Sequence, residues 1–222
     1  MPQSVRLLYE ENMINELIKR YPCLEGCRNE IENAVDRLAL CYENGGKLLL
    51  CGNGGSAADC EHISGELMKS FLIKRPLSDE KKEKMAEKLP EISEIAEKLE
   101  GGLPAISLPS LTSFNTAFTN DADPRLVYAQ ALVALAKEGD VLIAISTSGN
   151  SENIVNAAKT AKALGLTVIS LTGKSGGKLK EISDVAICVP EEETYKIQEL
   201  HQPVYHCICG EIEKRFFVDK RS

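Results

Sequence analysis

Tryptophan is absent from this 222-residue chain, histidine occurs only three times, and aromatic residues make up 5% of the sequence. Hydrophobic residues still account for 43%, so a core of ordinary size has to be built from Leu, Ile, Val and Ala. No apolar run approaches the roughly 20 residues that a membrane-spanning helix needs. No dense basic run occurs, and the net charge of −7 argues against a general nucleic-acid binder. We therefore expect neither a membrane nor a nucleic-acid partner.

The eight cysteines show no zinc-ribbon spacing. Those in apolar or helical contexts are Cys51, Cys60, Cys188, Cys207 and Cys209. Such cysteines are typically buried free thiols, which persist in a reducing compartment. The first six residues lead directly into an amphipathic segment, so we expect no signal peptide. Together these features predict a cytoplasmic protein.

Short apolar runs alternate with helical patterns along most of the chain. The runs that read as strands are 47–51, 103–108, 141–145, 167–172 and 184–189. Buried runs of this length, separated by amphipathic segments, are typical of parallel strands with helices on both faces of the sheet. The predicted fold class is α/β, a doubly wound five-stranded parallel sheet.

Two segments stand outside this alternation. Residues 1–45 contain two amphipathic helical patterns, at 4–21 and 24–44, and belong to no βαβ unit. We predict an N-terminal helical hairpin outside the layers of the sheet, whose apolar stripes need a partner such as a second copy of the chain. The main domain, 46–222, carries a highly charged insertion at about 72–102. It is predicted to be a helical hairpin with a solvated face, with a lid over the site as the alternative.

The turn Ser146–Ser151 (STSGNS) follows one buried strand and precedes a helix. Its hydroxyls, its backbone N–H groups and the positive end of the helix dipole suit a phosphate dianion without any lysine. The alternative is simple helix capping, because Ser and Asn are common N-cap residues. Four hydroxyls in six residues exceed what capping requires, so we favour the phosphate site.

Two more polar turns follow strands. Gly52–Ser56 (GNGGS) joins the first strand to a helix, and its glycines allow a ligand to approach the backbone closely. It lacks both the G-x-G-x-x-G pattern and a P-loop lysine, so a nucleotide site is not indicated. Asn120-Asp121 ends a short helix after the second strand. Ligands of doubly wound sheets bind at the carboxyl ends of the strands, so the three turns are expected to share one rim.

The three histidines lie on two predicted helices. His62 precedes Glu66 by four residues, which places both side chains on one helix face. On the last helix, Gln198 and His206 lie roughly 80° apart around the axis, whereas His201 and His206 lie roughly 140° apart. Gln198 and His206 can therefore face one site while His201 points elsewhere. The set suits a divalent ion such as Zn²⁺ or an acid/base pair, and an unrelated surface arrangement is the alternative.

Taken together, these motifs resemble the sugar isomerase (SIS) domain family, and most closely its phosphoheptose isomerases. The resemblance covers most of the chain outside 72–102. Its motifs are CGNGGS at 51–56, His62 with Glu66, Asn120-Asp121, STSGNS at 146–151, LTGKSGG at 171–177, and IQELH at 197–201 with His206 beyond. It implies the flavodoxin-like SIS fold, a homotetramer, and isomerisation of sedoheptulose 7-phosphate to D-glycero-D-manno-heptose 7-phosphate.

The resemblance also implies roles for matching residues. Sugar contacts are implied for Asn53, Gly54, Gly55, Asn120 and Asp121, and phosphate contacts for Ser146, Thr147, Ser148 and Ser151. Glu66 and His206 would be the acid/base pair of an enediol reaction. Where one zinc per chain is present, its ligands would be His62, Glu66, Gln198 and His206. Glu66 and Gln198 would also contact substrate.

The chain departs from the isomerase pattern at several positions. Met68–Phe71 replaces the usual small residue and arginine after Glu66-Leu67, and Tyr195 stands where an aspartate is usual. Pro203 lies inside the last predicted helix. A related adaptor of the same fold, the replication-initiator-associating protein, binds without catalysis and lacks the second catalytic histidine. His206 therefore favours an isomerase of a sugar phosphate over a phosphosugar-binding adaptor or sensor.

Overall fold

The structure, a computed structural model, describes residues 12–218 and is built around one parallel sheet. Its strands lie in the order β2-β1-β3-β4-β5. They are β1 (Leu48–Gly52), β2 (Ala105–Ser107), β3 (Val141–Ile145), β4 (Thr167–Thr172) and β5 (Val185–Cys188). Every predicted strand is present, with bounds within two residues. β1 and β3 are entirely buried because helices cover both faces of the sheet. The predicted doubly wound α/β class is confirmed.

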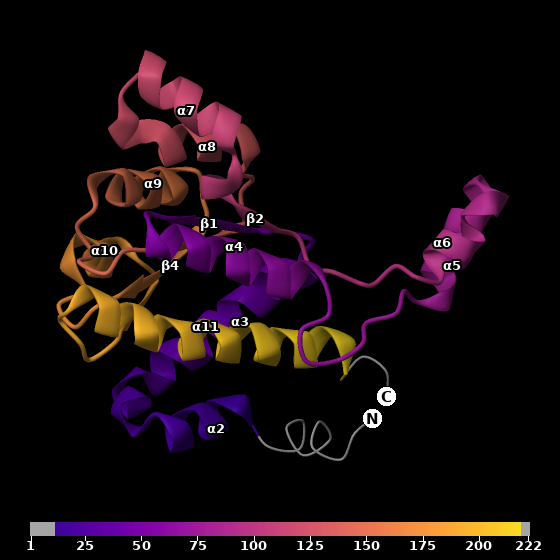
Figure 1. Ribbon diagram of the computed structural model, residues 1–222, viewed down its shortest axis with the longest axis horizontal. Coiled ribbons are helices and arrows are strands. Elements are labelled where there is room, and N and C mark those ends of the chain that lie inside the picture. Colours follow the sequence, from indigo (N-terminus) through magenta and orange to yellow (C-terminus); the bar gives the residue numbers. More distant parts are fainter. Residues whose placement is uncertain (1–11, 219–222) are drawn as a thin grey trace.

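One face of the sheet is covered by α3 (Arg28–Glu43), α4 (Gly55–Met68) and α11 (Thr194–Phe217), with α2 (Met13–Arg20) packed on the outside of α11 (Figure 1). The alternation of β-strand side chains divides the core. Leu48, Leu50, Ile143 and Ile169 point into this layer. A 3₁₀ turn, Pro22–Cys27, joins α2 to α3.

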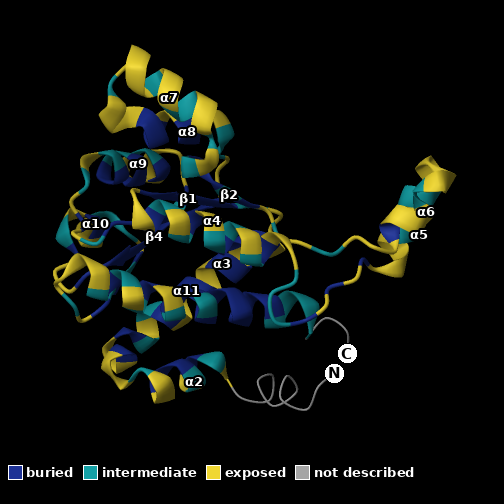
Figure 2. Cartoon of the chain, in the orientation of Figure 1, coloured by how far each residue is buried: buried dark blue, intermediate teal, exposed yellow. Residues whose placement is uncertain are grey.

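The opposite face is covered by α8 (Val127–Leu135), α9 (Glu152–Ala163) and α10 (Gly177–Ile182). Leu49, Leu142, Ala144 and Val168 point into this second layer. The helix α7 (Thr112–Asp121) lies beyond α8 and contains no fully buried residue. Short 3₁₀ turns, Leu108–Ser110 and Pro124–Leu126, precede α7 and α8. Figure 2 shows the buried residues gathered between these layers.

The N-terminal helices differ from the expectation in one respect. The segment predicted as 4–21 is described only from residue 12, and α2 begins at Met13. Both helices were expected to lie outside the covering layers, and for α3 this is wrong. Its Ile31, Val35 and Leu38 are buried in the main core because the helix packs directly on the sheet. Residue 45 therefore does not separate two cores.

The insertion forms an arm that stands away from the rest of the molecule (Figure 1). It contains α5 (Asp79–Lys88), a 3₁₀ turn (Pro90–Ile92) and α6 (Ser93–Ala96), so the predicted helical hairpin is present with a short second helix. An antiparallel bridge between Pro76 and Glu100 closes its base. In this structure the arm does not lie over α4 and α11, so the lid alternative gains no support.

The last helix, α11, runs for 24 residues and continues through Pro203. Pro203 has no N–H to donate, so one bond of the helical ladder is missing at that point. Buried Glu211 and Glu213 lie near its end. No helix within residues 12–218 combines the length and apolar character needed to cross a membrane.

Candidate active site

The hydroxyl-rich turn Ser146–Ser151 connects β3 to α9 as predicted. Ser151 occupies the N-cap position of α9, but its side chain caps no backbone N–H. Its hydroxyl instead accepts a hydrogen bond from the Ser146 hydroxyl, at 3.1 Å. The capping alternative is therefore wrong for Ser151, and the positive end of α9 is left without a side-chain acceptor from this residue.

The turn that follows β4, residues 173–177, fixes the shape of this hydroxyl-rich loop. Gly149 has a φ of +65°, and a Cβ at this position would collide with the carbonyl oxygen of Gly176. The amide of Gly173 donates to Thr147 O at 2.9 Å, which joins the loop to the end of β4. A cavity of about 540 Å³ opens between the two turns. Its lining includes Thr147, Ser148, Lys174, Ser175 and Ile197.

The glycine turn after β1 lies beside this loop. Asn53 and Asn153 exchange two amide hydrogen bonds, both 2.9 Å long, which tie the β1–α4 turn to the first turn of α9. Gly54 has a φ of +56°, a conformation that favours glycine. A Cβ at Gly55 would collide with the Gln198 amide, so that amide would have to move to admit a side chain there. Two of the three predicted turns therefore meet at one rim.

The third turn, Asn120-Asp121, is placed less closely. Both residues are exposed at the end of α7, and Asn120 donates to Asp121 at 2.8 Å. In the described chain neither side chain has a hydrogen bond to the other two turns. The following segment approaches α9, since Arg125 pairs with Glu152 at 3.4 Å. The sugar contacts implied for Asn120 and Asp121 remain a prediction.

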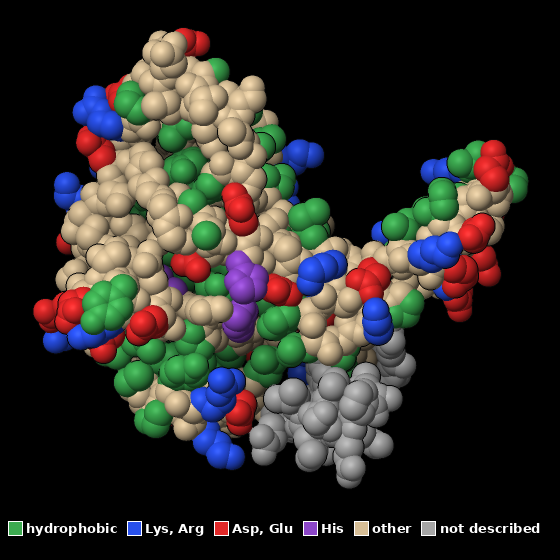
Figure 3. Space-filling model, viewed as in Figure 1, with side chains coloured by type: hydrophobic (Ala, Val, Ile, Leu, Met, Phe, Trp, Pro, Cys, Tyr) green, Lys and Arg blue, Asp and Glu red, His purple; other side chains and the backbone are tan. Residues whose placement is uncertain are grey.

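Histidine and glutamate side chains from α4 and α11 converge on the face shown in Figure 3, where histidine atoms lie exposed beside acidic ones. His62 Nε2 lies 3.2 Å from Glu66 Oε1, one helical turn away on α4. His206 of α11 places its Nε2 3.4 Å from the same His62 nitrogen. The packing of α4 on α11 brings together these three residues, for which the family resemblance implied a joint role.

Tyr205 and Asp59 extend this cluster, although neither was predicted from the sequence. The Tyr205 hydroxyl lies 3.0 Å from His62 Nδ1 and donates to Asp59 Oδ1 at 3.3 Å. The single proton of the phenol can be donated to only one of these two atoms at a time. Tyr205 therefore links the carboxyl group of Asp59 to the imidazole of His62. The signal was local, because Asp59 precedes His62 by three residues and Tyr205 precedes His206 by one.

Burial changes the protonation of this cluster. The pKa of His206 is lowered by desolvation and by the neighbouring His62, although Glu66 opposes the shift. The pKa of Asp59 is raised, mainly because burial penalises its charge. The ring of Phe71 lies 5.6 Å from that of His206 and contributes to its burial. At neutral pH His206 is therefore an uncharged imidazole with a lone pair available.

Two other predicted residues of α11 are His201, which lies where its angle around the helix axis predicted, and Gln198, which does not reach the histidines. His201 points away from the cluster, is fully buried, and lies with Nε2 3.2 Å from Thr172 O. Gln198 lies on the same side of α11 as His206 but eight residues earlier, which is roughly 12 Å along a helix. Its amide packs against Gly55, so the structure does not bring Gln198 to the histidines.

The donor set partly fits a zinc ion. In a tetrahedral site with bonds of about 2.0–2.2 Å, neighbouring ligand atoms lie about 3.3–3.6 Å apart. The 3.2 and 3.4 Å separations around His62 Nε2 are close to that range. No group of three or more His, Cys, Asp or Glu side chains in residues 12–218 is already arranged around one point, however. The side chains supply suitable donors in an open arrangement.

Comparison with known proteins identifies relatives over nearly the whole chain. A family model described as the SIS domain matches residues 12–105 and 91–173. A phosphoheptose isomerase of Helicobacter pylori (strain P12) is 39% identical over 193 residues, covering 87% of this chain and 88% of that protein. One from Clostridium acetobutylicum is 39% identical over 191 residues, covering 86% and 85%. The solved phosphoheptose isomerase of Neisseria gonorrhoeae superposes with a TM-score of 0.71 at 33% identity, covering 90% and 94%.

Proposed function

This chain belongs to the SIS domain family, and from that premise we propose that it isomerises sedoheptulose 7-phosphate to D-glycero-D-manno-heptose 7-phosphate. The relatives named phosphoheptose isomerase cover most of the chain and support this substrate. One observation carries the proposal: α11 lines the cavity of the hydroxyl-rich turn at Ile197 and also carries His206 into the Glu66–His62 cluster. A phosphate-binding loop and a proton-transfer cluster therefore share one helix.

The reaction moves a proton between adjacent carbons through an enediol. It needs a base that takes the proton from carbon, a group that serves the oxygens, and a fixed phosphate that orients the chain. Glu66 and His206 take the first two roles in our proposal, in either order. Ser146, Thr147, Ser148 and Ser151 hold the phosphate. The loop's backbone and the start of α9 add dipoles of the correct sign for a dianion.

The alternative function is a phosphosugar-binding adaptor or sensor without catalysis. It would use the hydroxyl-rich turn but would not need the second histidine. The position of His206, 3.4 Å from His62 and with a lowered pKa, favours the enzyme. An isomerase assay across sugar phosphates of five to seven carbons distinguishes the two. Turnover is expected with sedoheptulose 7-phosphate, and the absence of turnover with every sugar would contradict the proposal.

We also propose one Zn²⁺ per chain, held by His62, Glu66 and His206. Glu66 and His206 are also the proposed acid/base pair, so their two roles compete in any one complex. When bound, such an ion polarises a carbonyl oxygen as a Lewis acid. Gln198 remains the predicted fourth ligand, and ligation would require its amide to leave Gly55. Elemental analysis of chelator-free protein is expected to give about one equivalent per chain, reduced by His62→Ala. Fully active protein without metal would contradict this proposal.

A homotetramer and a cytoplasmic location complete the proposal. The eight cysteines are all free thiols, and six of them are buried, which suits a reducing compartment. The chain also leaves the apolar side chain of Leu40 exposed on the outside of α3, where a second copy of the chain would bury it.

A further inference from the structure

Arg75, at the base of the arm, is completely buried. A buried guanidinium is rare unless its donors are satisfied, and here each of its three nitrogens has a hydrogen-bond acceptor. Nη2 donates to Glu66 O and Nη1 donates to Leu67 O, both at 2.9 Å. Nε donates to Glu213 Oε1 at 2.6 Å, and the ring of Phe217 lies 4.6 Å from the guanidinium carbon.

Glu213 forms the other half of this contact. It lies on α11, two helical turns after His206, and is also completely buried. Its Oε1 accepts the Phe71 amide at 2.9 Å, and its Oε2 accepts the Leu72 amide at 2.8 Å. The carboxylate thus holds the segment that leaves α4, while Arg75 holds the carbonyls that end α4.

The Arg75–Glu213 pair therefore links the last turn of α4 to α11. That turn contains Glu66, whose own backbone carbonyl accepts one of the arginine bonds. The partner helix carries His206. Because helices are stiff over one or two turns, the pair fixes the position of Glu66 on α4 relative to His206 on α11. An error of about 1 Å in such a placement can lower turnover a hundred-fold.

We propose that Arg75 and Glu213 are positioning residues that hold Glu66 at the acid/base cluster. They touch no substrate and act through the backbone of α4. The proposal rests on the proposed isomerase function. Lysine cannot replace Arg75, because its ammonium lacks the planar fork that reaches two carbonyls and a carboxylate at once. A residue that served stability alone would not be expected to affect turnover in the folded enzyme.

The test compares three full-length variants by kcat, KM for sedoheptulose 7-phosphate, and melting temperature. Arg75→Lys and Glu213→Gln remove parts of the pair. Asp140→Asn is the matched control, because Asp140 is also a buried carboxylate that accepts two backbone amides, those of Lys47 and Lys137, and pairs with the Lys47 side chain. It lies at the amino end of β3, whereas ligands bind at the carboxyl ends of the strands.

We expect kcat to fall about ten- to a hundred-fold in Arg75→Lys and Glu213→Gln. KM should stay near the parent value, because the phosphate loop has no hydrogen bond to the pair within the described residues. Asp140→Asn should lower the melting temperature and keep the parent kcat.

Parent kcat in a folded Arg75→Lys variant would overturn the positioning role while leaving the isomerase function intact. If Glu213→Gln does not fold, Arg75→Lys decides alone. An equal fall of kcat in Asp140→Asn would also overturn the positioning role, since the effect would then follow stability. A parent protein without any turnover would overturn the proposed function and the positioning role together.

Discussion

Glu66 lies one turn from His62 on α4, whereas His206 reaches the same imidazole from α11. Nearly isosteric substitutions of Glu66 and His206 test whether these two side chains carry the proton transfer. We expect Glu66→Gln and His206→Asn each to lower kcat by about 10²- to 10⁴-fold, the usual contribution of a positioned acid or base. The measurement is turnover of sedoheptulose 7-phosphate, with circular dichroism to confirm that the fold is retained.

A neighbouring carboxylate provides the control for this prediction. Glu61 lies on the same helix, is exposed, and accepts a hydrogen bond from the Ser110 hydroxyl at 3.1 Å. Glu61→Gln should leave kcat unchanged. Parent turnover in both Glu66→Gln and His206→Asn would show that these residues do not carry the proton transfer.

Ser148 tests the phosphate loop. Its exposed hydroxyl accepts the Asn150 amide at 3.2 Å, so Ser148→Ala costs about 1 kcal/mol of stability whatever the loop binds. If the hydroxyl also binds the substrate phosphate, the lost bond to a charged group is worth roughly 1.5–3 kcal/mol. That corresponds to a loss of about ten- to a hundred-fold in affinity. Calorimetric titration with the phosphosugar measures it.

The matched ligand is a non-phosphorylated analogue of the same sugar. Its affinity should barely change in Ser148→Ala, because its predicted contacts are at Asn53 and Asp121. Equal losses for both ligands would indicate general damage to the site. Unchanged affinity for the phosphosugar would show that the Ser148 hydroxyl does not hold phosphate.

The relative positions of two site residues could be predicted from the sequence where both lie close together on the same helix. His62 and Glu66 are four residues apart, and they lie side by side as expected. Gln198 and His206 lie on one side of α11, as the angle between them around the helix axis predicted. That angle does not take into account the distance along the axis between residues that are eight positions apart. The Arg75–Glu213 pair could not be predicted at all, because its members are 138 residues apart and meet only through tertiary packing.

At the scale of elements, α11 is fixed to the sheet by a histidine that takes no part in the site. His201 is fully buried, and burial lowers its pKa to about 4. The hydrogen bond that its Nε2 donates to Thr172 O acts in the opposite direction but is the smaller effect. The unfolded chain has an ordinary histidine pKa of about 6.5. Between pH 6.5 and 4 the unfolded state therefore binds more protons, so folding stability falls as the pH falls.

The expected size of this effect is at most about 3 kcal/mol over that range, since one pKa unit corresponds to about 1.4 kcal/mol. Urea unfolding at pH 7 and pH 4.5 measures it in the parent and in His201→Gln. The glutamine amide can still donate to Thr172 O but does not titrate. The variant should lose less stability on acidification than the parent, and an equal loss would rule out His201 as the source.

The strands were predictable because each is a short apolar run with polar turns at its ends, and their bounds agree within two residues. The position of α3 could not be predicted, because its apolar stripe shows only that the helix must pack against some other surface. That partner is the sheet itself, with Ile31 and Leu38 in the core. The arm was predictable as helical from the spacing of its apolar residues, whereas its projection away from the body was not.

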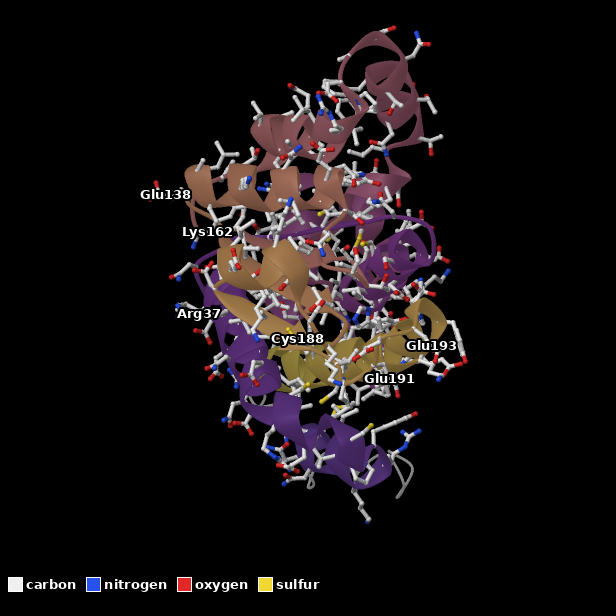
Figure 4. The ribbon with its side chains drawn as sticks, turned by 90° about the vertical axis from the view of Figure 1, so that its left-hand side faces the viewer. Arg37, Glu138, Lys162, Cys188, Glu191 and Glu193 are labelled. Atoms are coloured by element: carbon white, nitrogen blue, oxygen red, sulfur yellow. The ribbon has the colours of Figure 1, made fainter. Side chains whose placement is uncertain are left out.

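At the scale of the whole molecule, the strand order determines where the site lies. β1 and β3 are neighbours although β2 lies between them in sequence. Their connections leave toward opposite faces, α4 to one and α9 to the other. In Figure 4, Glu138 before β3 and Glu191 after β5 lie on opposite sides of the molecule, at the two ends of the sheet. The rim tied by Asn53 and Asn153 is at the carboxyl end, where doubly wound sheets bind ligands.

The predicted homotetramer also concerns the whole molecule, because it requires a surface on which copies of the chain can pack. The apolar stripe of α2 is satisfied within the chain, because Ile14, Leu17 and Ile18 are buried in the main core. The case for assembly therefore moves to α3, where Leu40 remains 52% exposed. A groove of about 320 Å³ between α2 and α11 also opens beside His206, so a second copy packed there would adjoin the site.

Light scattering at micromolar concentration is expected to give four times the 24.3 kDa mass of the chain. Leu40→Lys should lower that mass, because a charge in a buried apolar contact is costly. Val133→Lys is the matched control, since Val133 is 60% exposed on α8, on the opposite face of the sheet. A monomeric parent would contradict the tetramer. An unchanged mass in Leu40→Lys would remove α3 from the interface, and an equal change in both variants would place α8 in the interface as well.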